Sequence, residues 1–305
     1  MIKVFGHKSP DTDATGSPVI WAWYLSEVKG LPARPVLLGE PNTEAAFVLD
    51  HWGIERPEII TALAGGEDVV VVDTNNPAEL PDGIHEANII AIIDHHMLAG
   101  GLKTRQPIEI TIRPLACTAT VMHDLIGSDL ARAPRHIKGV MLSCILSDTL
   151  EFRSPTTTDH DRQVAEDLAA DLGLDIPGYA ARMFQAKSDV SAFSDAELLQ
   201  MDSKQYEVGG KKLRVSVLET TSPQILLDRK DGLIAAMPAV QAADGSDETL
   251  LFVVDILKGE STLLLPNDVV RHVAKATFGV AAAGDAVLLP GIVSRKKQIV
   301  PVLKV

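Results

Sequence analysis

The chain has 305 residues, of which 46% are hydrophobic, 23% are charged and only 4% are aromatic, a composition that predicts a soluble two-domain protein with an aliphatic core. Its formal net charge of −13 argues against non-specific binding to nucleic acid, because the phosphate backbone requires clustered cations on its partner. No apolar stretch approaches the ~20 residues of a membrane-spanning helix, so we expect no membrane partner.

Short apolar runs alternate with helical patterns over residues 1–187. Strands are predicted at residues 2–5, 34–39, 68–73 and 88–94, and helices at residues 19–28, 43–52, 136–149 and 158–172. The run at 68–73 is β-branched and unbroken, which suits a parallel strand that is buried on both faces. The alternation predicts an α/β fold with a doubly wound, mainly parallel sheet.

A polar segment at residues 188–194 is predicted to link this domain to a second one, residues 195–305. The second domain is expected to be a smaller α/β domain with a mixed sheet. Its strands are predicted at residues 213–219, 249–256 and 261–266. The basic run at 295–297 is expected to lead into a last strand, in which Lys297 would point away from its neighbour Lys296.

Cys117 and Cys144 are the only cysteines, and both lie in apolar segments. The N-terminal residues have the pattern of a strand and lack the features of a signal peptide. We therefore expect reduced cysteines in a cytoplasmic protein.

Carboxylates and imidazoles gather at the carboxyl ends of three predicted strands. The first predicted strand is followed by His7, Asp11 and Asp13. The third ends at Asp73, and the fourth ends at Asp94, His95 and His96. Ligands of open parallel sheets bind outside the carboxyl ends of the strands, so these side chains should converge on one crevice. Asp148 continues the apolar face of the predicted helix at 136–149, where a carboxylate needs a partner or a metal ion.

Taken singly, these groups have local explanations. Asp11 and Asp13 could cap a turn, and Asp148 could accept a backbone hydrogen bond. Together, they form a mixed set of nitrogen and oxygen donors that suits Mn²⁺, Co²⁺ or Zn²⁺. About six such ligands fit a two-metal site of the kind that supports phosphoryl transfer.

Four segments in this order, "GHKSPDTDA", "VVVVDTNN", "AIIDHH" and "SCILSDT", resemble the DHH phosphoesterase superfamily. With "MDSKQYE" and the terminal "SRKKQIVPV", the chain resembles family II inorganic pyrophosphatase, the manganese- or cobalt-dependent class, over nearly all of its length. One position departs from the pattern: Thr74 stands where the family often has a histidine. Since that position is not a metal ligand of the family, we expect it to tune activity at most.

The resemblance implies two Mn²⁺ or Co²⁺ ions per chain, held by six side chains: His7, Asp11, Asp13, Asp73, His95 and Asp148. Asp73 would be shared between the ions, and Asp94 would orient a histidine from behind. Pro10 would fix a turn that directs the first three ligands inward. His96 would face the oxygen that joins the two phosphates of pyrophosphate, and Lys204, Arg295 and Lys296 of the second domain would grip phosphate oxygens.

The activity implied is hydrolysis of pyrophosphate to two phosphates by a metal-bridged hydroxide in a cleft between the two domains, with an additional Mg²⁺ arriving with the substrate. A short-chain exopolyphosphatase of the same superfamily is the alternative, because cleft shape alone would decide the chain length. A DHH nuclease is disfavoured, since the glycine-rich, histidine-containing motif of those enzymes is missing from this sequence. The resemblance also implies a homodimer built through the N-terminal domain.

Overall fold

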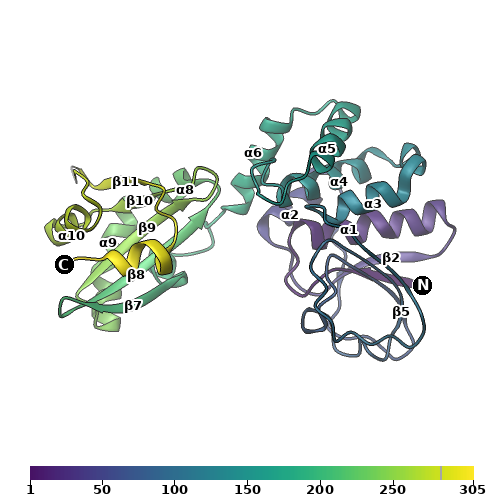
Figure 1. Ribbon diagram of the computed structural model, residues 1–305, viewed down its shortest axis with the longest axis horizontal. Helices are drawn as coiled ribbons and strands as arrows, with labels where there is room; N and C mark the ends of the chain where they lie inside the picture. The colour runs from purple at the N-terminus through teal and green to yellow at the C-terminus, as the bar shows by residue number, and fades with distance from the viewer. Residues whose placement is uncertain (282–283) are drawn as a thin grey trace. The chain divides into compact units, whose positions relative to one another are not determined.

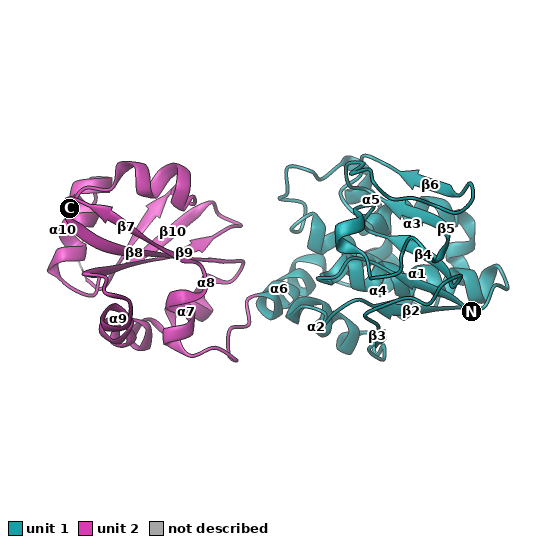
Figure 2. Cartoon of the chain, turned by 90° about the horizontal axis from the view of Figure 1, so that it is seen from below, with its two compact units in different colours: residues 1–187 teal, residues 188–305 magenta. Residues whose placement is uncertain are grey.

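The computed structural model describes residues 1–281 and 284–305, which divide into two compact units, Met1–Lys187 and Ser188–Val305 (Figures 1 and 2). Each unit has its own sheet and its own hydrophobic core. Among the described residues, no helix combines the length and the apolar character needed to cross a membrane.

Unit 1 is built on a six-stranded sheet in the order β3-β2-β1-β4-β5-β6, in which every pair is parallel. Its strands are β1 (Ile2–Phe5), β2 (Ala33–Leu37), β3 (Glu58–Ile59), β4 (Asp68–Val72), β5 (Asn88–Asp94) and β6 (Glu109–Ile112). The chain moves outward from β1 in one direction to β3 and then in the other from β4 to β6. The point of reversal therefore lies between β1 and β4, where doubly wound sheets form their ligand crevice. The predicted parallel α/β fold is confirmed.

Six helices accompany this sheet: α1 (Thr12–Trp23), α2 (Thr43–His51), α3 (Thr118–Ile126), α4 (Arg135–Asp148), α5 (Asp159–Leu172) and α6 (Ile176–Lys187). Short helical turns cover Tyr24–Val28, Pro77–Glu79 and Gly127–Arg132. Residues 69–72 of β4 are all buried, as expected for a strand covered on both faces.

The first helix begins seven residues earlier than the sequence pattern predicts, at Thr12 rather than at residue 19. Asp11 is its N-cap and accepts a hydrogen bond from the Ala14 backbone N–H at 2.9 Å. Glycine, serine and proline at 16–18 obscure the helical pattern, yet a small residue is needed there. A Cβ atom at Gly16 would collide with the side chains of Cys144 and Val140 on α4. The expected turn around Pro10 is thus the start of a helix that packs closely on α4.

Unit 2 has a five-stranded sheet in the order β11-β10-β9-β8-β7, which is mixed because only β8 and β9 run parallel. Its strands are β7 (Ser203–Val208), β8 (Lys211–Thr220), β9 (Glu248–Asp255), β10 (Glu260–Leu264) and β11 (Ala286–Pro290). Its helices are α7 (Asp195–Met201), α8 (Pro223–Leu227), α9 (Lys230–Asp244) and α10 (Asp268–Phe278). The side chains of α7, α8 and α9 pack in one apolar cluster and those of α10 in another, so the sheet separates two layers of helix.

The last basic segment is helical, and the predicted terminal strand is wrong. Residues Arg295–Ile299 form one wide helical turn and Val300–Val302 a 3₁₀ turn. Ser294 caps the first turn by accepting from the Lys297 backbone N–H at 3.3 Å, and the Gln298 side chain donates to the Gly291 carbonyl at 2.7 Å. Buried Ile299 attaches the turn to the apolar cluster of α10. Lys297 was expected to point away from Lys296 because side chains alternate along a strand. That reason does not apply in a helical turn.

Candidate active site

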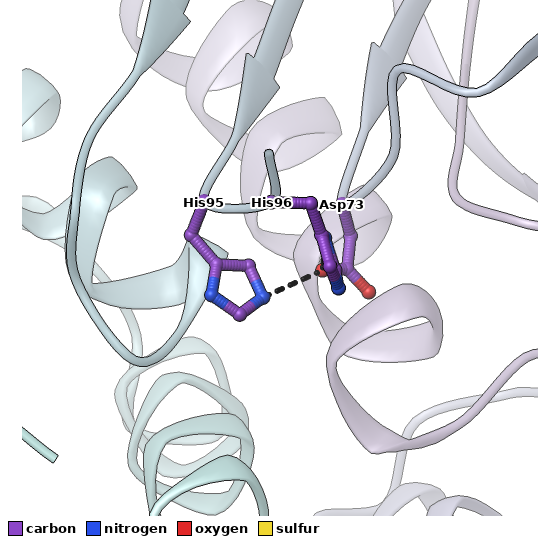
Figure 3. Close-up of side chains that lie close together, drawn as sticks. All are labelled: Asp73, His95 and His96. Carbon is purple, nitrogen blue, oxygen red and sulfur yellow. Dashed lines mark ion pairs between the residues drawn. The ribbon is translucent and has the colours of Figure 1, made fainter. Parts of the chain in front are cut away.

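The predicted ligands that follow β1, β4 and β5 come together at the carboxyl edge of the sheet. His7 Nε2 lies 3.6 Å from Asp11 Oδ2 and 3.6 Å from Asp73 Oδ2. The other oxygen of Asp73, Oδ1, lies 3.4 Å from His95 Nε2, and Figure 3 shows His95, His96 and Asp73 side by side. His96 Nδ1 lies 3.8 Å from the same oxygen, Oδ1. Asp73 thus has an imidazole near each of its two oxygens, the arrangement expected of a carboxylate that is shared between two ions.

The backbone at Asp73 is bent sharply to achieve this. Asp73 has a φ of +58°, which is unusual for a residue with a side chain, and its N–H donates to the Ile93 carbonyl at 2.9 Å. Thr118, the first residue of α3, donates from Oγ1 to Asp73 Oδ1 at 3.0 Å. Such strain costs about 1–3 kcal/mol and persists where the surrounding structure requires it. The bend comes directly after the buried strand β4, at the carboxyl edge of the sheet.

A second group joins α1 and α4. Ligand atoms of Asp13, Asp148 and Cys117 all lie within 4.8 Å of one another. Asp13 accepts from Ser17 Oγ at 2.5 Å and from the Thr118 backbone N–H at 2.7 Å. By contrast, Oδ2 of Asp148 is buried and has no hydrogen-bond partner in the described structure. Cys117 was not predicted to lie here, because its apolar sequence context indicates only a buried residue.

The carboxylates of this edge repel one another. Burial raises the pKa of Asp73 well above its ordinary value, and the charges of Asp13 and Asp11 raise it further. Burial together with Asp13 and Asp11 also raises the pKa of Asp148. Buried like charges and an unpartnered carboxylate oxygen are the features that a bound cation removes. The side chains present therefore fit the divalent metal pair that the resemblance implies.

Asp94 is fully buried and orients His96 rather than His95. Its Oδ1 accepts from His96 Nδ1 at 2.9 Å and from the backbone N–H groups of His95 and His96, and Asn75 donates to its Oδ2 at 2.6 Å. The His95 ring instead donates from Nδ1 to the Leu115 carbonyl at 3.1 Å, which leaves Nε2 facing Asp73. The orienting group of the proposed ligand His95 is thus a backbone carbonyl. The hydrogen bond to Asp94 raises the pKa of His96 and favours its protonated form.

Glu44 on α2 is a supporting residue that the sequence did not reveal. It is fully buried and accepts from Thr12 Oγ1 at 3.0 Å and from Ser147 Oγ at 2.7 Å. Lys187 Nζ lies 3.1 Å from the same carboxylate. Thr12 stands between two predicted ligands and Ser147 precedes Asp148, so one carboxylate holds the ligand-bearing ends of α1 and α4. The only signal in the sequence is its place in the first turn after the N-cap Asn42, which does not predict burial.

A pocket of about 560 Å³ adjoins the predicted ligands at the edge of the sheet. Both His7 and His96 line it, together with Lys8, Asn75 and Glu79. His96 therefore borders open space on one side and hydrogen bonds to Asp94 on the other. A ligand in this pocket could contact this imidazole directly.

The three predicted cations of unit 2 line one pocket of about 720 Å³. Lys204 comes from β7, and Arg295 and Lys296 come from the terminal helical turn. The guanidinium of Arg295 is already held by Asp202, through the Asp202 carbonyl at 2.8 Å and its carboxylate at 2.6 Å. Asp202 was not predicted to take part, although it lies two residues before Lys204 in the sequence. Lys297 is not among the residues that line this pocket.

Comparison with known protein families defines the class of protein. Residues 1–147 match the description "DHH family, N-terminal domain", and residues 181–305 match "DHHA2 domain". A structure of an exopolyphosphatase-related protein from Bacteroides fragilis shares the fold, with a TM-score of 0.51 and 14% identity over 98% of this chain and 89% of that one. By fold and by site, this is a two-domain DHH protein.

Full-length relatives narrow this class. The chain is 40% identical over 310 residues to a "probable manganese-dependent inorganic pyrophosphatase" of Deinococcus radiodurans, with 100% of this chain and 98% of the relative covered. It is 36% identical to the protein of the same name from Streptococcus mutans, over 99% of this chain and 97% of the relative. A crystal structure described as that of a "putative family II inorganic pyrophosphatase" from Methanococcus jannaschii matches with a TM-score of 0.63 and 33% identity, over 99% of this chain and 97% of the other. The chain belongs to the family of manganese-dependent inorganic pyrophosphatases.

Proposed function

We propose that the protein hydrolyses pyrophosphate to two phosphates. The observation that carries this proposal is Asp73, whose two oxygens face His7 and His95 at 3.6 and 3.4 Å. A carboxylate in this position suits two neighbouring ions, and paired ions suit the in-line displacement of a phosphate group. The names of the full-length relatives point to the same substrate.

The proposed metal ligands are the six side chains of the sequence prediction: His7, Asp11, Asp13, Asp73, His95 and Asp148. Two imidazoles and four carboxylates suit Mn²⁺ or Co²⁺, and an additional Mg²⁺ would accompany the substrate phosphates. When bound, the ions supply Lewis acidity and a water of lowered pKa. Unpartnered Asp148 Oδ2 supports a ligand role for α4, because a buried carboxylate oxygen needs a cation or a donor.

The protein's own groups then act on charge and protons. We assign to His96 the donation of a hydrogen bond or proton to the oxygen between the two phosphates, since Asp94 keeps its ring oriented and raises its pKa. Lys204, Arg295 and Lys296 are assigned to phosphate oxygens, because they line one pocket of unit 2. Asp202 would position the guanidinium of Arg295 so that its remaining N–H groups face the phosphate.

We also propose a homodimer through unit 1. The strand β6 is one of the two outer strands of the sheet and pairs only with β5 in the described structure. Ile110 on this strand is 52% exposed, and nearby Ile90 on β5 is also exposed. An edge strand with exposed apolar side chains requires cover. Sedimentation at micromolar concentration tests this assignment, and a monomer there would contradict it.

A cytoplasmic protein is proposed from the cysteines. Cys117 and Cys144 are both free and buried, which suits a reducing compartment. Export of a tagged full-length chain in its native host would contradict this assignment.

The decisive experiment measures phosphate released from pyrophosphate and from tripolyphosphate, and mononucleotide released from a dinucleotide, each with Mn²⁺, Co²⁺ or Mg²⁺ as the only metal. Pyrophosphate should be the fastest substrate, and Mn²⁺ or Co²⁺ the most effective ion. Lys204→Ala should slow the hydrolysis of pyrophosphate, because Lys204 lines the basic pocket. Lys211→Ala is the matched control, because Lys211 begins β8 and does not line that pocket. Faster release from tripolyphosphate under the same metal would favour an exopolyphosphatase, and faster cleavage of the dinucleotide would favour a phosphodiesterase.

A further inference from the structure

A second group of metal-ligand side chains lies on unit 1, outside the proposed metal pair. His123 and Asp124 belong to α3 and His160 belongs to α5, and their ligand atoms lie within 4.8 Å of one another. Asp124 Oδ1 is the common point, 2.8 Å from His160 Nε2 and 3.3 Å from His123 Nδ1. The group therefore consists of two imidazoles facing one carboxylate oxygen.

The other oxygen of Asp124 is fixed from behind. Arg113, which follows β6, lies 2.6 Å from Asp124 Oδ2 through Nη1. This ion pair turns Oδ1 toward the two histidines, in the way that a supporting residue orients a metal-binding carboxylate. The side chains of His123, Asp124 and His160 are 30%, 25% and 45% exposed. An ion from solution can therefore reach the group, and water can complete its coordination.

We propose that His123, Asp124 and His160 form a separate binding site for Zn²⁺. Two imidazole nitrogens and one carboxylate oxygen form a ligand set used for Zn²⁺, which accepts water in its fourth position. The proposed metal pair has a different donor set, with twice as many carboxylates as imidazoles. By the Irving–Williams order, the imidazole-rich group selects Zn²⁺ over Mn²⁺ more strongly than the carboxylate-rich pair does.

An ion at this site would join α3 to α5, and α3 supports the proposed metal pair. Thr118 at the start of α3 donates to both Asp13 and Asp73. Asp161, the residue after His160, accepts from the Ala116 backbone N–H at 3.1 Å, just before α3. A bound Zn²⁺ would add a further connection between the two helices. We therefore assign the site a structural role in holding α3 in place.

The test uses the full-length protein saturated with Mn²⁺. The protein is dialysed against micromolar Zn²⁺ with Mn²⁺ in excess, and both metals are counted per chain. The number of Mn²⁺ ions lost per chain is subtracted from the number of Zn²⁺ ions gained. This subtraction removes any Zn²⁺ that has replaced Mn²⁺ at the proposed metal pair. The variants are His123→Gln and His160→Gln, with His85→Gln as the matched control, because His85 is exposed and belongs to no metal-ligand group among the described residues.

One extra Zn²⁺ per chain should be retained by the unmodified protein and by His85→Gln. Each of the two ligand variants should lose it, with an affinity at least tenfold weaker, and Zn²⁺ should raise the melting temperature only where it is retained. Equal Zn²⁺ content in all four proteins, or no Zn²⁺ beyond that replacing Mn²⁺, would overturn the proposal. Because the count is independent of pyrophosphate hydrolysis, this result is separate from the test of the proposed function.

Discussion

The acidic cluster of unit 1 and the basic pocket of unit 2 balance their charges in different ways. In unit 1, burial and neighbouring carboxylates raise the pKa of Asp73 and Asp148, and Asp148 Oδ2 has no described hydrogen-bond partner. In unit 2, Arg295 already has a counterion in Asp202. We therefore expect the cluster to depend on cations from solution, whereas in the basic pocket Asp202 already holds Arg295. Mutations should accordingly affect metal binding in unit 1 and substrate binding in unit 2.

The largest effect is expected for Asp73→Ala. This change removes the carboxylate that faces both His7 and His95, so at least one of two tightly bound Mn²⁺ ions should be lost. The loss of affinity should exceed the ~10–100-fold that follows removal of an outer supporting group. Metal analysis after dialysis measures this, with Asp68→Ala at the opposite end of the same strand as the control. Two tightly held ions in Asp73→Ala would refute the shared-ligand assignment.

His96→Gln should leave both metals bound but slow turnover by roughly 10²–10⁴-fold, the usual value of general acid catalysis. His95→Gln should instead weaken metal binding, and added Mn²⁺ should partly restore its activity. The reason is geometric: the His95 ring faces Asp73, and the His96 ring is held by Asp94. Turnover is measured against Mn²⁺ concentration for both variants. If excess Mn²⁺ restored only His96→Gln, the two roles would be exchanged.

Arg295→Lys should reduce kcat/KM by about 10–100-fold and leave the metal content unchanged. A lysine is a point charge that cannot contact both Asp202 and a phosphate with a planar fork. Loss of a hydrogen bond to a charged group costs about 1.5–3 kcal/mol. Steady-state kinetics measure the effect, with Lys297→Ala as a neighbouring control outside the pocket. Normal kinetics in Arg295→Lys would remove this residue from the substrate site.

A smaller effect is expected for Ser147→Ala, which removes one donor to Glu44 next to Asp148. Mn²⁺ affinity should fall by about tenfold, the lower end of the range for supporting groups. Ser143→Ala on the same helix is a matched control, because this buried hydroxyl contacts Trp52 and Tyr179 instead. Isothermal titration compares the two. Equal Mn²⁺ affinities would show that Glu44 does not position the ligands.

The smallest effect concerns the metal-free protein. The pKa of Asp148 is raised in the folded protein. The contribution of protonated Asp148 to the free energy of unfolding is therefore fully present below the ordinary aspartate pKa, and it is lost as the pH rises through the folded-state pKa. Asp148→Asn removes this loss, so at neutral pH in chelator it should melt a few degrees higher, since 1 kcal/mol corresponds to about 2–4 °C in a domain of this size. With Mn²⁺ the order should reverse, because only the unmodified protein gains the full metal site. If metal-free Asp148→Asn melted at a lower temperature than the unmodified protein at neutral pH, repulsion between Asp148 and its neighbouring carboxylates would not destabilise the fold.

The parallel sheet and the shared edge at which the proposed ligands lie could be predicted because both depend on local sequence. The β-branched runs of β4 and β5 form strands wherever they are buried, and residues that follow neighbouring parallel strands reach the same edge. The start of α1 and the terminal helical turn were mispredicted. Small residues at 16–18 conceal a helix that is stabilised by packing on α4, and Ser294 and Gln298 cap a turn that apolar alternation alone would assign to a strand.

By itself, the sequence determined which residues are candidates for the proposed chemistry: the donors that follow the strands of unit 1 and the basic residues of unit 2. Only the tertiary structure decided how each group is held. Glu44 and Ser147 are 103 positions apart, and the Leu115 carbonyl reaches His95 across 20 positions. The same holds for the cluster of His123, Asp124 and His160, which combines two helices. Burial and distance between such residues depend on the packing of whole elements, and no local pattern of residues encodes them.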